Sequence, residues 1–218
     1  MPNRRPAAFD LTVTAESATG RPFMPFLRKH LRAAHAILKP ALREFSVALV
    51  GDATMSRLHV QFMNVAGPTD VLTFPLDEDA RGRVTAGEVV VCVPEARRRS
   101  KAEGTDVRRE VLLYALHGML HLCGYDDTTP AEFARMHRAE DRILTRLGVG
   151  PVFAAAAGSG RKTGAGKVGE TGTPGRIGNR GAAARGSTGV QSPPAMQRTK
   201  PGTAARRRGP AAARRPAR

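Results

Sequence analysis

Two histidines and an aspartate lie close together in the segment HGMLHLCGYDD, which runs from position 117 to position 127. His117 and His121 are four residues apart, so on a helix their side chains share one face, about 6 Å from each other. Gly124 ends that helix, and the turn after it can bring Asp127 back toward the imidazoles. Two imidazoles and a carboxylate can hold Zn²⁺ and leave one coordination position open for water. The spacing predicts a single-metal site at His117, His121 and Asp127, with no catalytic residue identified beyond the metal-bound water.

The same histidine spacing also occurs in helices that bind no metal. Here Leu116, Leu120 and Leu122 place the pair near the core, where two unpaired imidazoles are costly, and this favours the metal. Peptidases of the H-E-x-x-H type carry a general-base glutamate directly after the first histidine, and this chain has Gly118 there. Cleavage of a phosphodiester in RNA is therefore favoured over peptidase activity. The motif does not choose between water and a neighbouring 2′-hydroxyl as the nucleophile in that cleavage.

The elements that must position these residues follow from the hydrophobic pattern. Alternation and β-branched residues predict strands over 9–13, 45–50, 70–76 and 87–93. Helical periodicity predicts helices over 21–39, 53–63, 94–103, 105–122 and 131–147. Strands and helices are interspersed, with helices dominating the second half. The pattern favours an α+β or α/β fold, with one mixed sheet covered by helices.

Composition divides the 218 residues into two parts. Residues 154–218 carry 14 Lys and Arg against one acid, with 13 of the 23 Gly, whereas residues 1–153 are nearly balanced in charge. Residues 154–218 contain few large apolar side chains, and burying these cannot offset the entropy lost when the segment becomes ordered. We therefore expect a disordered basic tail. Residues 1–153 are long enough to form one folded domain.

Several classes of protein are disfavoured by the composition. No apolar run is long enough to span a membrane, and no apolar segment follows the charged start to form a signal peptide. The two cysteines, Cys92 and Cys123, do not make a disulfide framework, so we expect a reducing, cytoplasmic setting. The absence of Trp and the presence of only two Tyr disfavour an aromatic platform for stacking bases.

Three ordered blocks resemble the YbeY family of metal-dependent endoribonucleases. The segment around His117 and His121 matches its H-G-x-L-H-L-x-G-Y-D signature, and residues 68–75, PTDVLTFP, resemble its P-T-D-V-L-S-F-P block. Residues 87–96 resemble its G-(D/E)-I-x-I strand, and Met136 and Glu140 lie where its last helix has M-x-x-x-E. The resemblance spans roughly residues 9–147, and three blocks in order are far more specific than one motif.

The resemblance implies a YbeY-like, zincin-like α+β fold with one divalent ion, Zn²⁺ or a similar ion, on His117, His121 and Asp127. It implies an endoribonuclease that acts on single-stranded RNA, in maturation of small-subunit ribosomal RNA and in ribosome quality control. The expected partners are ribosomal RNA and the small ribosomal subunit, with no membrane and no nucleotide cofactor. The alternative is a ribosome-associated RNA-binding factor whose metal is structural and whose catalysis is weak or absent.

Two positions depart from the family pattern. The family usually has a third histidine where this chain has Asp127, which would make the site less electropositive. The family's L-N-x-x-(Y/F)-R block reads LHVQFM at residues 58–63, so Met63 stands where an arginine is expected to help hold phosphate. The nearest bases along the chain are Arg57 and the run from Arg97 to Lys101.

Other residues are weaker candidates for contact with substrate. One charged run consists of Arg97, Arg98, Arg99 and Lys101. It is either a solvated face or a surface that binds RNA phosphates. The basic tail has the same two interpretations. His59 occupies the family's Asn position. It either faces the site or is a partly exposed helix residue, and the second interpretation is favoured. Thr69 and Asp70 either orient a ligand imidazole or form an ordinary turn.

Overall fold

The computed structural model describes residues 8–153, and these form a four-stranded mixed sheet. The strands lie in the order β1 (Asp10–Ala15), β2 (Glu44–Val50), β4 (Val84–Cys92) and β3 (Val71–Glu78). The first three are parallel, and β3 is antiparallel to β4 at one edge of the sheet. The short β3–β4 connection permits the antiparallel pair, whereas the parallel strands require helical crossovers.

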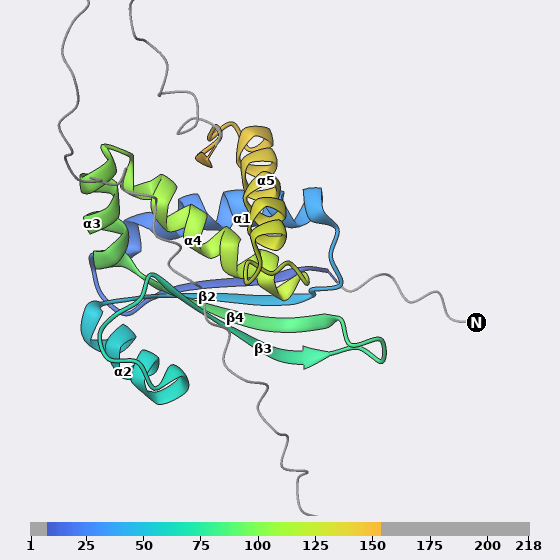
Figure 1. Cartoon of the computed structure of the whole chain (residues 1–218), viewed down its shortest axis with the longest axis horizontal. Helices are drawn as coiled ribbons and strands as arrows, with labels where there is room; N and C mark the ends of the chain where they lie inside the picture. The colour runs from blue at the N-terminus through green and yellow to red at the C-terminus, as the bar shows by residue number, and fades with distance from the viewer. Residues whose placement is uncertain (1–7, 154–218) are drawn as a thin grey trace, which may run out of the picture.

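The helices are arranged on both faces of this sheet (Figure 1). In the described chain they are a short 3₁₀ helix η1 (Arg21–Phe23), α1 (Met24–Leu38), α2 (Asp52–Met63), α3 (Val93–Glu103), α4 (Val107–Leu122) and α5 (Pro130–Arg146). Helices α1 and α4 lie over one face, with α3 at one end of α4 and α5 at the other, and α2 lies on the opposite face (Figure 1).

Alternation along the strands explains how both faces are covered. Val89 and Val91 of β4 belong to the main core beneath α1 and α4. Val90, between them, points the other way and packs with Leu72 and Met55 in a smaller cluster beneath α2. Most of α4 is buried, so this helix is the centre of the domain rather than an amphipathic cover.

The predicted α+β fold with one mixed sheet covered by helices is confirmed, and every predicted element is present. The helix predicted from Thr105 begins two residues later, because the Asp106 carboxylate accepts from the Arg108 amide and caps it. Thr105 instead donates its hydroxyl hydrogen to Glu110. Across residues 8–153, no helix is both long and apolar enough to cross a membrane. The predicted tail lies outside the described residues.

Candidate metal centre

The last two turns of α4 and the loop after it build the candidate site. His117 and His121 lie on one face of α4, as their spacing predicts. Beyond Leu122 the chain turns at Gly124, whose φ of +82° is a left-handed conformation that glycine adopts at no steric cost. The Tyr125 amide then donates to the carbonyl of Leu120, which folds the loop back along the helix toward the histidines.

The three predicted ligands converge. The Nε2 atoms of His117 and His121 are 3.1 Å apart, and Asp127 places one carboxylate oxygen 3.7 Å from Nε2 of His117 and the other 3.9 Å from Nε2 of His121. One ligand atom from each of the three residues lies within 4.8 Å of the other two. Ligands about 2.0–2.1 Å from a tetrahedral zinc ion are themselves roughly 3.3 Å apart, so the cluster has the size that such an ion requires.

The outer nitrogen of each imidazole is already engaged. Nδ1 of His117 is 2.7 Å from an oxygen of Glu140, and Nδ1 of His121 is 3.1 Å from the carbonyl of Tyr125. A carbonyl and an ionised carboxylate only accept hydrogen bonds, so both Nδ1 atoms carry the hydrogen. The two Nε2 lone pairs and the Asp127 carboxylate then face one another, which is stable only with a cation between them, either a metal ion or a proton.

The pKa values of the two histidines are shifted in opposite directions by their surroundings. Burial opposes a charge on His117, but the hydrogen bond to Glu140 and the nearby carboxylates outweigh it and raise the pKa of His117. Burial and the neighbouring His117 lower the pKa of His121. Burial opposes a charge on Glu140 too, but hydrogen bonds from His117 and His137 hold the pKa of Glu140 below its usual value. The site therefore holds an ionised, fully buried carboxylate behind His117.

Glu140 is a candidate functional residue to which the sequence reasoning assigned no role. Its side chain is completely buried, and its second oxygen is 2.6 Å from Nδ1 of His137. His137 is fixed in turn between Phe133 and Phe153, whose ring centroids lie 3.9 and 3.7 Å away. A carboxylate that holds the outer nitrogen of a histidine ligand fixes the tautomer and orientation of that ring.

Gly118 lies against the sheet. A Cβ atom at this position would come 2.5 Å from Cγ2 of Val89 and 2.9 Å from the hydroxyl of Thr73, so even an alanine would clash. The general-base glutamate of an H-E-x-x-H peptidase has no room at this position. The hydroxyl of Thr73 is buried there without a hydrogen-bond partner among the described residues.

The remaining sequence candidates lie apart from the three ligands or contribute indirectly. The Asp70 carboxylate accepts from the Thr69 hydroxyl and the Val71 amide, which is turn chemistry, and its charge also helps raise the pKa of His117. His59 is half-buried, with Nδ1 2.9 Å from the carbonyl of Gly67. Met63 packs against the smaller apolar cluster beneath α2.

The basic run on α3 lies at the end of α4 that is remote from His121 (Figure 1). Arg98 pairs with Asp52 and Glu95, and Arg99 pairs with Glu103. The structure brings together His117, His121 and Asp127 but does not add Arg97, Arg98, Arg99 or Lys101 to that group. Contact between these four residues and RNA stays a prediction.

Comparison with known proteins supports the resemblance seen in the sequence. A family model described as Endoribonuclease YbeY matches residues 15–148. The Endoribonuclease YbeY of Kineococcus radiotolerans is 42% identical over 118 residues, which are 49% of this chain and 68% of that protein. The corresponding protein of Thermobifida fusca is 42% identical over 110 residues, 47% of this chain and 71% of that protein.

One further relative and one solved structure are also similar to the chain. The Endoribonuclease YbeY of Mycobacterium tuberculosis is 38% identical over 110 residues, which are 46% of this chain and 62% of that protein. One solved structure, the solution structure of TM1509 from Thermotoga maritima, matches with 22% identity and a TM-score of 0.44, covering 72% of this chain and 99% of the other. The match of the family model over most of the folded domain, together with these relatives, shows that the chain belongs to the YbeY family of endoribonucleases.

Proposed function

We propose that this chain is an endoribonuclease that cleaves single-stranded RNA with one divalent ion held by His117, His121 and Asp127. The observation that carries the proposal is the convergence of two Nε2 lone pairs and a carboxylate, with both Nδ1 atoms already engaged. Two nitrogens and one oxygen suit Zn²⁺ and leave a fourth position free, so zinc is the ion we propose. An ion bound there would act as a Lewis acid toward a phosphoryl oxygen and make a coordinated water more acidic.

The protein's own groups then have distinct tasks. Glu140 and the carbonyl of Tyr125 hold the two imidazoles with Nε2 directed into the site. Asp127 adds a negative charge that family members with a third histidine lack, so we expect weaker attraction of phosphate than in those proteins. Gly118 supplies no base, so we propose that water or the neighbouring 2′-hydroxyl of the RNA takes part in proton transfer.

The substrate we propose is ribosomal RNA of the small subunit, with roles in its maturation and in ribosome quality control. Membership of an endoribonuclease family supports RNA as the substrate class. The proposal places the protein in the cytoplasm, with the small ribosomal subunit as partner and without a nucleotide cofactor.

The test is cleavage of a labelled single-stranded RNA by the full-length chain and by the His121→Ala variant, at the same free zinc concentration. The matched control is His35→Ala on α1. This histidine lies outside the cluster of proposed ligands, and its Nε2 is 2.7 Å from the backbone carbonyl of Leu42. We expect cleavage and stoichiometric zinc in the wild type and the control, and loss of both in His121→Ala. Equal cleavage by all three proteins would refute the proposal.

One observation favours a second function, that of an RNA-binding factor with a structural metal. Met63 stands where the family pattern has an arginine, and it packs against apolar side chains rather than presenting a charge. On this reading, chelation lowers the melting temperature but leaves binding to the small subunit intact. A wild-type protein that holds zinc and binds the subunit but cuts no RNA would favour this second function.

A further inference from the structure

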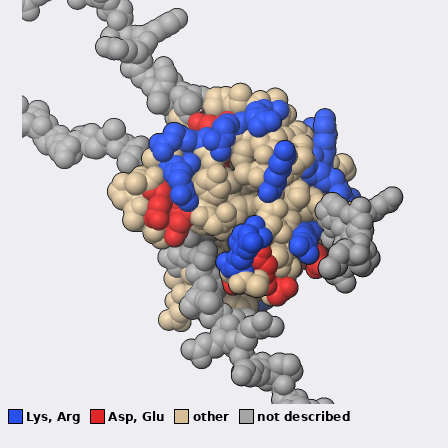
Figure 2. Space-filling view, turned by 90° about the vertical axis from the view of Figure 1, so that its right-hand side faces the viewer, with Lys and Arg blue, Asp and Glu red and all other residues tan. Residues whose placement is uncertain are grey.

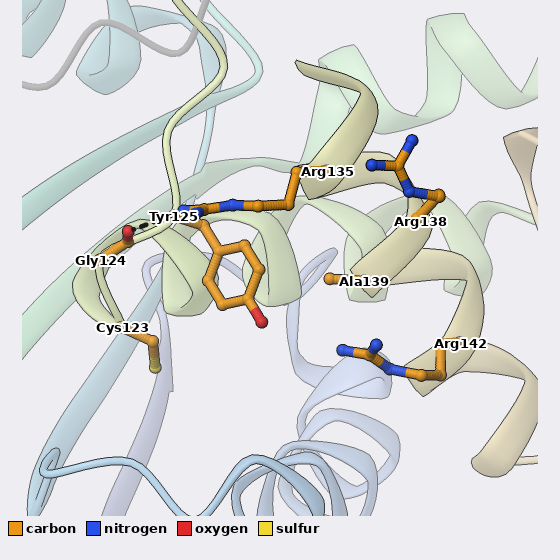
Figure 3. A pocket seen from close by; sticks show the side chains of 7 residues that line it. All are labelled: Cys123, Gly124, Tyr125, Arg135, Arg138, Ala139 and Arg142. Carbon is orange, nitrogen blue, oxygen red and sulfur yellow. Dashed lines mark hydrogen bonds between the residues drawn. The ribbon is translucent and has the colours of Figure 1, made fainter. Parts of the chain in front are cut away.

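A hollow adjoins the loop after α4, on the flank formed by α5 (Figure 3). Its volume is about 350 Å³, and one wall is the loop from Cys123 to Tyr125. The other wall is α5, which contributes Arg135, Arg138 and Arg142. These arginines are spaced i, i+3 and i+7, so the helix presents all three on one face. The hollow is thus a pocket with three cations on a single rigid element.

The three arginines of this pocket form no ion pair with a carboxylate among residues 8–153. Within residues 8–153, neither Arg138 nor Arg142 has a carboxylate within ion-pair distance, in contrast to Arg98 and Arg99 of α3. Arg135 donates to the carbonyl of Gly124 at 3.3 Å and lies 5.0 Å from the centre of the Tyr125 ring. These contacts hold its guanidinium in place without cancelling its charge. Three like charges around one hollow favour an anion.

The other groups that line the pocket suit an anion as well. Ala139 is small and nearly buried, which leaves space between the arginines. Figure 3 shows Tyr125 and Arg142 extending toward the middle of the hollow from opposite walls, with the Tyr125 hydroxyl directed inward. Guanidinium forks and a phenol are donors that match phosphate oxygens.

The pocket and the histidine cluster share one segment of chain. Tyr125 contributes its side chain to the pocket and its carbonyl to Nδ1 of His121, and the neighbouring Gly124 carbonyl accepts from Arg135. A polyanionic strand that crosses this loop can therefore contact both places. Figure 2 shows further Lys and Arg side chains spread over this end of the molecule, with the acidic side chains in smaller groups.

We propose that Arg135, Arg138 and Arg142, with the Tyr125 hydroxyl, bind the phosphodiester backbone of the RNA strand at nucleotides beyond the cleaved bond. The proposal rests on the proposed ribonuclease function, because it is RNA at the histidine cluster that brings a strand across the loop. The contacts are to phosphates, so the pocket adds affinity without reading sequence.

The test compares Arg138→Gln/Arg142→Gln with the wild type in the full-length chain. Binding of a fluorescent single-stranded RNA 12-mer is followed by anisotropy over a series of salt concentrations, with a gel to confirm that the probe stays intact. Each phosphate contact contributes about 0.7 to the slope of log K against log salt for single strands, so we expect the slope to become shallower by about 1.4. In cleavage assays KM should rise with kcat unchanged, as for a contact made equally in the ground and transition states.

Two matched controls remove positive charge elsewhere. Arg108→Gln changes an exposed arginine at the opposite end of α4 and should leave the slope unchanged, and Lys101→Gln tests the basic run of α3. A slope and a KM that do not change in Arg138→Gln/Arg142→Gln would overturn the proposal, and so would a slope that becomes shallower only in Lys101→Gln. If the wild type cuts no RNA, the proposed function fails, whereas the pocket is still judged by the salt dependence of binding.

Discussion

Two groups of charged residues, one near each end of α4, are used in opposite ways. At the α3 end, Arg98 and Asp52 form an ion pair whose side chains are 48% and 45% exposed. At the α5 end, Glu140 is 0% exposed and is held between His117 and His137. Exposed pairs contribute little to stability because water screens them, whereas a buried charge must be fully compensated. The comparison teaches that the candidate metal centre lies beside a buried, compensated charge, not where exposed charges are most numerous.

The largest effect should follow from removing the buried charge. Glu140→Gln leaves an amide that cannot accept well from two imidazoles. We therefore expect a loss of about 3 kcal/mol in the free energy of unfolding of the metal-free protein, measured in the presence of a chelator. Because the ring of His117 is no longer fixed, zinc affinity should fall by roughly 10–100-fold. Urea unfolding and competitive zinc titration measure the two effects.

The matched substitution at the other end of α4 is Glu103→Gln, which removes the partner of Arg99 on α3. It should change stability by less than about 1 kcal/mol and leave zinc affinity alone. Similar losses in the two variants would mean that burial does not distinguish the two ends.

The next effect concerns the close contact between α4 and the sheet. An alanine is normally more favourable than glycine within a helix, by about 1 kcal/mol. Gly118→Ala should nevertheless destabilise the protein by about 2 kcal/mol, because its Cβ would overlap Val89 and the Thr73 hydroxyl. Thermal unfolding measures the loss. Adding Val89→Ala should recover part of it, and a double variant no better than the sum of the two single changes would argue against this packing.

A smaller effect should come from the start of α5, the helix that carries Glu140. Thr129 caps it through a reciprocal capping box, in which its hydroxyl oxygen accepts from the Glu132 amide and the Glu132 carboxylate accepts from the Thr129 amide. Thr129→Ala should cost about 1 kcal/mol in the free energy of unfolding. Thr145→Ala, an exposed change near the end of the same helix, is the control and should have almost no effect. Equal results would place the stability of α5 elsewhere.

The difference between the two ends also explains what the sequence alone could predict. The three proposed ligands lie within one helix and the loop after it, so their spacing and one glycine were enough to group them. The role of Glu140 depends on α5 folding back over α4, which no local pattern states. A signal was present, because Glu140 lies in the apolar stripe of α5, formed by Met136, Ala139, Ile143 and Leu144. A carboxylate in such a stripe requires a buried partner.

The fold was easier to predict than the site's surroundings for the same reason. Periodicity reports which face of each element is buried, and every element that it predicts is present. Helix α4 is the exception to a single buried face, because it is buried on nearly all sides. The close approach at Gly118 and the pocket beside Tyr125 depend on how elements pack, so they carry no periodic signal. No sequence pattern singled out Arg135, Arg138 and Arg142 of α5, because their lack of ion-pair partners within residues 8–153 is visible only in three dimensions.

The smallest effect should be at the exposed pair of the α3 end, and it should depend on pH. Hydrogen bonds from Arg98 lower the pKa of Asp52, so the ionised carboxylate is favoured in the folded state. The resulting stability is present above the unfolded pKa of about 3.9 and is lost as the pH falls through the lower folded value. A double-mutant cycle with Arg98→Gln and Asp52→Asn should give a coupling of about 0.5 kcal/mol at pH 7, shrinking toward zero as Asp52 becomes protonated. A coupling of several kcal/mol, or one that grows in acid, would show that the α3 end also depends on a charge shielded from water, and the contrast between the two ends of α4 would fail.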